Sequence, residues 1–243
     1  MINKSGFSEK LASALTKNGL GEFAKDHISY SLYALTERML TVNEYMNLTA
    51  ITDIDEIILK HYVDSLMISK YIPTDASVID VGCGAGFPSL PLAIARPDLT
   101  ITALDSTAKR VNYISETAEL LGVTNIIAIA ARAEEAANVP SYREKFDIAC
   151  ARAVARLNVL SELCIPFVKV GGSFVAMKAN AAEELSEAEK AIEKLGGELV
   201  STDRFDLVSE ANAEPRCIIS VKKVSQTPKN YPRNNSQIKK KPL

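Results

Sequence analysis

Residues 78–88 read Val-Ile-Asp-Val-Gly-Cys-Gly-Ala-Gly-Phe-Pro, and they decide the fold of this chain. Small apolar residues and one acid, Asp80, run directly into three alternating glycines, Gly82, Gly84 and Gly86. Such an apolar run is typical of a buried parallel strand. Glycine is needed where the backbone takes a positive φ or passes close to a ligand. A strand, a glycine turn and a following helix predict a nucleotide-type site at the carboxyl end of an open α/β sheet.

The spacing of the glycines narrows the class of ligand. The dinucleotide fingerprint reads G-x-G-x-x-G and brings a pyrophosphate to a helix N-terminus, whereas this loop reads G-x-G-x-G. The shorter form resembles motif I of S-adenosylmethionine-dependent methyltransferases, whose cofactor carries no phosphate. Asp105 follows about twenty residues later at the end of the next expected strand, where an acid can bind ribose hydroxyls. NAD remains the competing ligand, because the same acid suits its ribose. An ordinary βα turn with a solvated acid is the less favoured alternative.

Length and composition agree with an α/β enzyme. A chain of 243 residues, 47% of them apolar, suits one α/β domain with an accessory segment. We expect neither a signal peptide nor a membrane span. The four cysteines form no C-x-x-C pair, so we expect reduced thiols in a cytoplasmic protein, with neither a zinc site nor a disulfide framework.

The chain divides into a helical segment at 1–72, a methyltransferase-like domain at 73–223 and a basic tail at 224–243. In the first segment, apolar residues from Leu32 to Met46 repeat at helical spacing, and Asp53 is a candidate N-cap for the next helix. Strands are expected near residues 77–81, 100–104, 125–130, 146–150, 171–177, 197–205 and 216–223. Helices are expected near residues 87–95, 107–121, 132–137, 156–168 and 180–195. This alternation predicts a seven-stranded, mostly parallel sheet with helices on both faces.

The C-terminal tail differs from the body in charge. The chain has 28 basic and 30 acidic residues, and seven of the basic ones lie from Lys222 onward, where no acidic residue occurs. The tail also contains three prolines, so we expect it to be extended rather than packed. A basic arm on an acidic body indicates a phosphate-rich partner, and a merely solubilising tail is an equal alternative on charge alone.

The motifs together resemble those of the bacterial small-subunit ribosomal RNA guanine-N7 methyltransferases, also called glucose-inhibited division protein B. The resemblance covers nearly the whole chain, and the helical segment and the tail make it more specific than the glycine motif alone. The residues that carry it are Asn47-Leu48-Thr49, His61-Tyr62-Val63-Asp64-Ser65, Asp80 to Pro88, Leu104-Asp105-Ser106, Lys109-Arg110, Arg132-Ala133-Glu134, Ala151-Arg152-Ala153, Met177-Lys178, Tyr231-Pro232-Arg233 and Lys240 to Leu243.

The resemblance implies a Rossmann-like class I methyltransferase fold and methyl transfer from S-adenosylmethionine to N7 of one guanine in the decoding-region loop of 16S ribosomal RNA. Guanine N7 carries a lone pair and no proton, so this reaction needs neither a base nor a nucleophilic side chain, and positioning can suffice. The Asn/Asp-Pro-Pro-Tyr/Phe tetrapeptide of amino-group methyltransferases does not occur in the sequence. Cys150 has no neighbouring proline, so we interpret it as a small buried residue and not as the nucleophile of a cytosine-C5 enzyme.

The resemblance also implies a set of cofactor-binding residues. The alternative to cofactor binding is core packing for Phe87. For Glu134 the alternative is a solvated acid that stabilises the start of a helix. Arg152 follows an apolar strand and could hold the methionine carboxylate or the RNA, with a surface salt bridge as the less favoured alternative. The expected set is Gly82, Gly84, Gly86, Phe87, Asp105, Ser106, Thr107, Ala133, Glu134 and Arg152.

Catalytic and RNA-binding residues are expected around the same strand ends. Arg152, Lys178, His61 and Asn47 are the candidate catalytic residues, the last two by helping to shape the guanine pocket. His61 shares a helical face with Asp64 and Ser65, but a local network is favoured over a hydrolase triad because all three lie on one turn. As a set at or just past the strand ends, Lys109, Arg110, Arg132 and Lys178 favour binding of RNA phosphates, although each one alone is equally explained as a solvated charge. With two residues of the basic tail, the expected RNA-binding residues are Lys109, Arg110, Arg132, Arg233 and Lys240.

Three hypotheses of different class therefore remain. The first is the ribosomal RNA guanine-N7 methyltransferase, acting as a monomer without a metal on 16S RNA or the small ribosomal subunit. The second is a small-molecule enzyme on the same fold, either a methyltransferase that does not need the basic tail or an NAD-linked dehydrogenase. The dehydrogenase is disfavoured because neither histidine lies in the second half of the chain. The third is a non-catalytic ribosome-assembly factor that keeps the fold.

Overall fold

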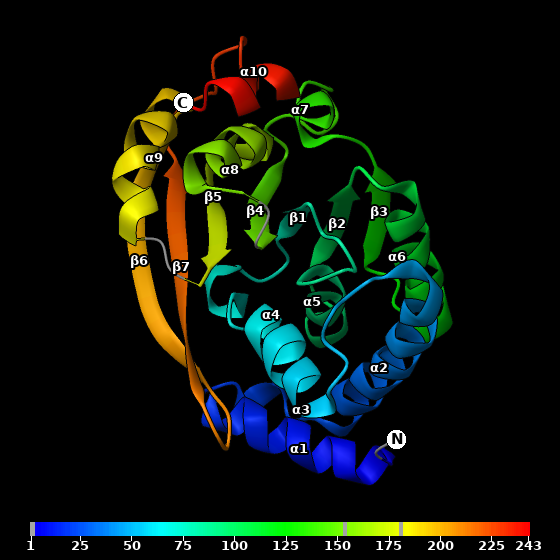
Figure 1. Cartoon of the computed structure of the whole chain (residues 1–243). Helices are drawn as coiled ribbons and strands as arrows, with labels where there is room; N and C mark the ends of the chain where they lie inside the picture. The colour runs from blue at the N-terminus through cyan, green and yellow to red at the C-terminus, as the bar shows by residue number, and fades with distance from the viewer. Residues whose placement is uncertain (1–2, 153–154, 180–181) are drawn as a thin grey trace.

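The computed structural model describes residues 3–152, 155–179 and 182–243 (Figure 1). Ala153 of the Arg152 motif and the first two residues of the helix expected near 180–195 lie outside the described residues. Within them, one sheet of seven strands has the order β3-β2-β1-β4-β5-β7-β6, and β7 alone runs antiparallel to its neighbours. The strands are β1 (Ser77–Val81), β2 (Thr100–Asp105), β3 (Ile126–Ala130), β4 (Phe146–Arg152), β5 (Val168–Lys178), β6 (Gly197–Val208) and β7 (Ala213–Lys223). The predicted mostly parallel sheet is confirmed.

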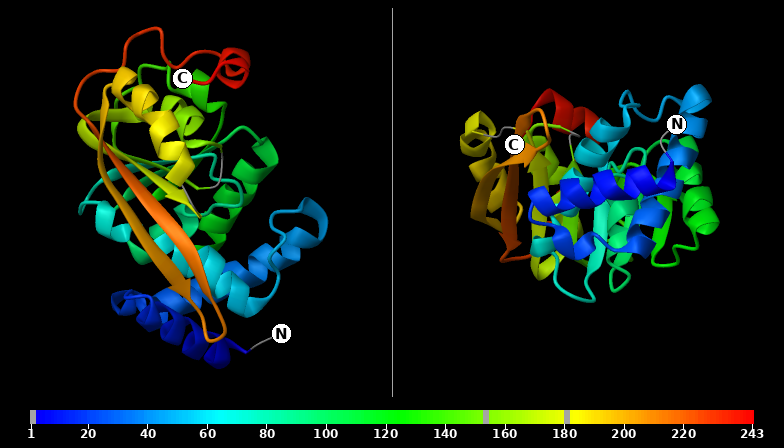
Figure 2. Two further views of the ribbon diagram at one scale, coloured as in Figure 1. Left: turned by 60° about the vertical axis from the view of Figure 1, so that its left-hand side comes forward. Right: turned by 90° about the horizontal axis from the view of Figure 1, so that it is seen from below.

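Helices cover both faces of the sheet (Figures 1 and 2). They are α1 (Lys4–Lys17), α2 (Asp26–Met46), α3 (Ile54–Ile57), a π-helical stretch (Ile58–Val63), α4 (Asp64–Leu66), α5 (Ser89–Ala95), α6 (Ala108–Leu121), α7 (Ala133–Ala136), α8 (Leu157–Cys164), α9 (Ala182–Lys194) and α10 (Asn235–Lys240). Short 3-10 turns occupy Gly21–Phe23, Ser69–Tyr71 and Ile165–Phe167. The helix expected at 156–168 is shorter than predicted, because the turn at Ile165–Phe167 leads directly into β5 at Val168.

Alternating side chains of the strands build two hydrophobic clusters, one on each face. Val78 and Ile101 pack with α1, α2, the π-helical stretch, α5 and α6. Ile79 and Phe174 pack on the opposite face with α8, α9 and the tail residue Tyr231. The helical segment 1–72 therefore shares one core with the sheet, which fixes it against the strand ends. No helix in the described part of the chain combines the length and the apolarity needed to cross a membrane.

The helical segment follows the sequence pattern closely. Leu32, Leu35 and Met39 of α2 are fully buried, as their spacing predicts. Asp53 caps α3: its Oδ1 accepts hydrogen bonds from the backbone N–H groups of Asp55 at 3.0 Å and of Glu56 at 3.1 Å. This cap begins the helix that carries His61 and Asp64 toward the sheet.

The prediction of an extended tail is wrong. Tyr231 and Ile238 are buried, with 6% and 1% of their surface exposed, and residues Asn235–Lys240 form α10. Asn234 caps this helix through a hydrogen bond of 3.0 Å from the backbone N–H of Gln237. Two apolar anchors hardly change the composition of a basic, proline-containing segment, so composition alone could not reveal the packing.

Candidate active site

The glycine turn leaves β1 in a left-handed backbone conformation. Gly82, Gly84 and Gly86 have φ values of 76°, 58° and 89°. A Cβ added at Gly86 would lie 2.6 Å from Cδ1 of Leu90, so this glycine permits close packing of the turn on α5. A Cβ added at Gly84 would meet no atom within 4 Å, so the turn faces open space there. Gly84 thus leaves room for a ligand, as the motif predicts.

Asp105, at the end of β2, holds the glycine turn against the loop that leads into α6. Its Oδ2 accepts a hydrogen bond of 3.0 Å from the backbone N–H of Gly84, and its Oδ1 accepts one of 2.8 Å from the N–H of Thr107. Arg110 places a guanidinium nitrogen 3.7 Å from Oδ2. Each carboxylate oxygen retains a second lone pair for a further donor.

Asp80, the acid of the glycine motif, lies beneath the turn and not in a cavity. It is buried, and its Oδ2 accepts hydrogen bonds from the hydroxyl and the backbone N–H of Ser89, the latter at 3.2 Å. Burial raises the pKa of the Asp80 carboxyl to about 6, although the Ser89 bonds and Arg152 oppose this shift. Oδ1 is buried without a hydrogen-bond partner among the described residues. Asp80 therefore ties β1 to the start of α5.

A cavity of about 440 Å³ opens at the ends of β1, β2, β3 and β4, and we call it the strand-end cavity. It brings together seven of the ten expected cofactor residues: Gly82, Asp105, Ser106, Thr107, Ala133, Glu134 and Arg152. Arg110 and Arg132, expected to bind RNA, line it as well, as do Asn235 and Lys239 of α10, which the sequence analysis did not select. Gly84, Gly86 and Phe87 are not part of this lining, but Gly84 is hydrogen-bonded to Asp105.

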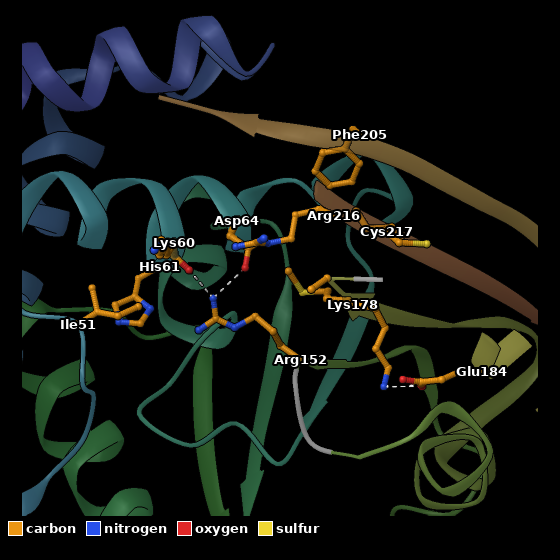
Figure 3. A pocket seen from close by; sticks show the side chains of 13 residues that line it. Ile51, Lys60, His61, Asp64, Arg152, Lys178, Glu184, Phe205, Arg216 and Cys217 are labelled. Carbon is orange, nitrogen blue, oxygen red and sulfur yellow. Dashed lines mark hydrogen bonds and ion pairs between the residues drawn. The ribbon is translucent and has the colours of Figure 1, made fainter. Parts of the chain in front are cut away.

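A second cavity of about 510 Å³ lies between the helical segment and the ends of β4, β5 and β7 (Figure 3). We call it the helix-side cavity. Its lining is Ile51, Lys60, His61, Asp64, Arg152, Met177, Lys178, Ala179, Glu184, Phe205, Arg216, Cys217 and Ile218. Arg152 lines both cavities, so its side chain lies between them.

Arg152 is held from the side of the helical segment. Its Nη1 donates hydrogen bonds to the carbonyl oxygen of Lys60 at 2.7 Å and to Oδ2 of Asp64 at 3.2 Å (Figure 3). Its guanidinium lies 5.5 Å from the centre of the Phe87 ring. Among the described residues only Nη1 donates to protein groups, which leaves Nε and Nη2 for a ligand. Only 17% of the Arg152 side chain is exposed, so its ion pair with Asp64 is not the surface salt bridge that was the alternative interpretation.

His61 stacks on Phe87, with ring centroids 4.3 Å apart and planes 9° from parallel. Its Nε2 lies 3.0 Å from Oγ1 of Thr49, while its Nδ1 is buried without a partner among the described residues. Burial, followed by the positive charge of Arg152, lowers the pKa of His61 to about 3. The imidazole is therefore neutral at pH 7. Phe87, which is also buried, packs in the core as well as supporting this ring.

Asp64 and Arg216 complete the arrangement, and the sequence analysis assigned neither a site role. The carboxylate of Asp64 retains only 10% exposure and lies between two guanidinium groups: its Oδ2 accepts from Arg152 and its Oδ1 accepts from Nε of Arg216 at 3.3 Å. Figure 3 shows both arginine side chains reaching this carboxylate, from β4 and from β7. Arg216 and Asp64 are 152 positions apart in the sequence, so no local motif could reveal the contact.

The sequence predicts a local network and not a hydrolase triad for His61, Asp64 and Ser65. Their contacts agree with this prediction. The hydroxyl of Ser65 donates to the backbone carbonyl of His61, and Asp64 is engaged by arginines. Lys178 lines the helix-side cavity, but its ammonium pairs with Glu184 at 2.8 Å and its side chain is only 9% exposed.

The structure does not bring every expected site residue into these cavities. Asn47 ends α2 with a φ of 51° and is exposed, and it lines neither cavity. Lys109 and Lys240 are exposed outside both linings. Arg233 is not a free cation, because it pairs with the fully buried Glu162.

The cysteines and the acidic groups supply no alternative chemistry in the described part of the chain. Cys150 is completely buried, and burial raises the pKa of its thiol well above the ordinary value, so it is not a nucleophile. No group of three or more metal-ligating side chains is found among the described residues.

Comparison with known proteins identifies the family to which this arrangement belongs. The family model described as rRNA small subunit methyltransferase G matches residues 29–211. The chain belongs to the rRNA small subunit methyltransferase G family. A relative named ribosomal RNA small subunit methyltransferase G from Lactobacillus delbrueckii subsp. bulgaricus is 48% identical over 212 residues, which cover 85% of this chain and 88% of the relative. One of the same name from Leuconostoc mesenteroides is 45% identical, with complete coverage of both chains. The predicted family is confirmed.

Solved structures agree on the fold. An S-adenosylmethionine-dependent O-methyltransferase from Thermotoga maritima has a TM-score of 0.53 at 17% identity, covering 80% of this chain and 72% of that one. TYW2 from M. jannaschii, in complex with AdoMet, has a TM-score of 0.54 at 15% identity, covering 66% and 75%. At these identities the likeness shows the fold alone. The expected Rossmann-like class I methyltransferase fold is confirmed, and members of the methyltransferase G family are S-adenosylmethionine-dependent enzymes.

Proposed function

We propose that this member of the methyltransferase G family transfers a methyl group from S-adenosylmethionine to N7 of one guanine in the decoding-region loop of 16S ribosomal RNA. One observation carries the proposal: a strand-end cavity beside the glycine turn and a second cavity lie on either side of Arg152, which lines both. Methyl transfer needs two such spaces, one for the methyl donor and one for the acceptor base, with an open path between them.

The strand-end cavity fits S-adenosylmethionine on its own geometry. The open space at Gly84 admits a ligand against the turn, and both oxygens of Asp105 keep a lone pair for ribose hydroxyls. The free N–H groups of Arg152 suit a carboxylate. When bound there, the cofactor would supply a methyl group on a positively charged sulfur.

The residues of the helix-side cavity suit an acceptor that has no proton to lose. His61 is neutral and buried, so it adds no positive charge beside the acceptor. Positive charge develops on the guanine ring as N7 bonds to carbon, and an imidazolium at this place would oppose it. Asp64 offsets the charge of Arg152 and fixes its guanidinium between the two cavities. Positioning and a suitable local field are thus the chain's contribution to catalysis.

The basic residues around the cavities suit RNA. Lys60 and Arg216 line the helix-side cavity, while Arg110 and Arg132 line the strand-end cavity. Cations at these places can contact phosphates on either side of an inserted base. We further propose that the chain acts as a monomer in the cytoplasm, requires no metal, and recognises RNA through Lys109 and Lys240 as well. Asn47, at the edge of the helical segment, would contact the RNA from outside the cavities.

The experiment that tests the proposal compares substrates. Labelled S-adenosylmethionine is incubated with small ribosomal subunits that lack N7 methylation, with naked 16S RNA and with a pool of small metabolites. The proposal predicts label in RNA and a loss of at least tenfold in turnover for Arg152→Ala. Label in metabolites alone would favour a small-molecule methyltransferase. Binding to subunits with no transfer to any substrate would favour an assembly factor.

A further inference from the structure

Two residues of the C-terminal helix α10 belong to the lining of the strand-end cavity. Asn235 and Lys239 share this cavity with Asp105 and Glu134, which lie at the ends of β2 and β3, more than 100 positions earlier in the chain. Figure 1 shows α10 beside α7 and α8.

The position of α10 is built into the fold by a buried ion pair. Glu162 of α8 is completely buried, and it accepts three hydrogen bonds from Arg233: from the backbone N–H at 2.9 Å, from Nε at 2.8 Å and from Nη2 at 2.6 Å. A buried carboxylate is costly unless it is paired, so Arg233 must stay in place. The residue expected to bind RNA therefore anchors the tail.

Further contacts hold the tail on both sides of this pair. Arg143 donates to the carbonyl oxygens of Thr227 at 2.9 Å and of Tyr231 at 2.8 Å. Ile238, on the inner face of α10, is 1% exposed. These contacts fix the place of α10, so the helix carries the exposed side chain of Lys239 at the rim of the cavity.

We propose that α10 forms part of the cofactor site and that Lys239 is a further cofactor-binding residue. Asn235 lies at both the strand-end cavity and the neighbouring groove along α7, together with Arg132 and Glu134, so α10 flanks the loop after β3. In open α/β sheets, loops at the carboxyl ends of the strands contact the bound ligand. Lys239 carries three donors and no acceptor, and it therefore suits the ring nitrogens and ribose oxygens of an adenosyl group.

This inference rests on the proposed function, because it assigns Lys239 to the cofactor of that reaction. It separates two roles within one short helix. Both lysines are exposed, but only Lys239 lines the cavity, whereas Lys240 lies outside it and stays available to RNA phosphate. The tail would thus contribute to cofactor affinity even when no RNA is present.

The test measures cofactor affinity without RNA. Titration calorimetry with S-adenosylmethionine and with S-adenosylhomocysteine is performed on the full chain, on Lys239→Ala and on the matched control Lys240→Ala. Both substitutions remove one charge from the same helix. We expect Lys239→Ala to weaken both ligands about tenfold, as the loss of a hydrogen bond from a charged donor predicts, and Lys240→Ala to stay within about twofold of the full chain.

A second variant removes the whole of α10 and keeps the ion pair that anchors the tail. A chain ending at residue 234 retains the Arg233–Glu162 pair and should bind at least tenfold more weakly, with an unchanged near-ultraviolet circular dichroism spectrum. Wild-type affinity in Lys239→Ala, or equal weakening in Lys240→Ala, would overturn the inference and leave the proposed function intact. Failure of the full chain to bind either ligand would overturn the proposed function and this inference with it.

Discussion

The substitution Asp64→Asn tests whether the orientation of Arg152 governs methyl transfer. Asparagine keeps the shape of the side chain and removes its charge. One amide oxygen can still accept from one arginine, but the amide NH₂ then faces the other guanidinium. The two lost or weakened bonds, of 3.2 Å to Arg152 and 3.3 Å to Arg216, each join charged groups.

The magnitude follows from the geometry of these bonds. A hydrogen bond between charged groups contributes about 1.5–3 kcal/mol. Both bonds are at the long end of the range, and each arginine keeps 17% exposure, so water replaces part of the loss. We expect the free energy of unfolding to fall by about 2 kcal/mol. Since Arg152 keeps only its bond to the Lys60 carbonyl, we expect kcat to fall by about tenfold or more, which corresponds to about 1.4 kcal/mol in the barrier.

The assay combines urea unfolding with initial rates at saturating cofactor, at a temperature where both variants are folded. Glu214→Gln is the matched control, because Glu214 lies 3.2 Å from Arg216 and 3.0 Å from Lys60 but makes no contact with Arg152 among the described residues. Glu214 is partly exposed, so this change should cost less than about 1 kcal/mol and leave kcat nearly unchanged. If Asp64→Asn lost stability but kept its kcat, or if both variants lost kcat equally, the positioning role would be refuted.

Three further predictions concern the glycine turn, the histidine and the arginine. Gly84→Ala should lower the free energy of unfolding by only about 1 kcal/mol, since its Cβ meets open space, but it should abolish cofactor binding in calorimetry. Gly86→Ala should lower the free energy of unfolding by at least about 2 kcal/mol because its Cβ clashes with Leu90, and a lower midpoint in urea would show this loss. The pKa of His61 is about 3 when folded and about 6.5 when unfolded, so the unfolded chain binds more protons between these values and stability falls as pH drops through them. At pH 5 the loss from this group is about 2 kcal/mol, and the difference in unfolding free energy between wild type and His61→Gln should shift by that amount from pH 7 to pH 5. Arg152→Ala should lower turnover more than it lowers the melting temperature, and an equal loss of both would make Arg152 merely structural.

The sequence predicted the sheet and the cofactor turn well because their signals are local. The strands are short apolar runs that end at turn residues, and Gly84 and Asp105 occupy fixed places at strand ends. The position of Arg152 in a cleft at the strand ends was also predicted, because a charged residue at the carboxyl end of a buried central strand points into that cleft. Each of these features depends on neighbours within a few positions, so pattern and spacing were sufficient.

The remaining features depend on contacts between distant segments. The charge of Asp64 is matched by Arg216 on the one antiparallel strand, and no spacing rule connects the two. Arg233 was assigned to RNA because it lies in the basic tail, whereas its partner Glu162 lies in a helix 71 positions earlier. Lys178 was expected to act in catalysis, but its pairing with Glu184 makes it part of the support for the cavity unless RNA displaces that acid.

The measurement that tests the central claim most directly is the position of the transferred methyl group. Small ribosomal subunits lacking N7 methylation are treated with the full chain and S-adenosylmethionine, and the 16S RNA is then cleaved chemically at N7-methylguanine. We expect one new cleavage, at a guanine in the decoding-region loop, and we expect Arg152→Ala to reduce it at least tenfold. Transfer to another atom or another nucleotide, or the absence of any cleavage under conditions where the cofactor binds, would contradict it.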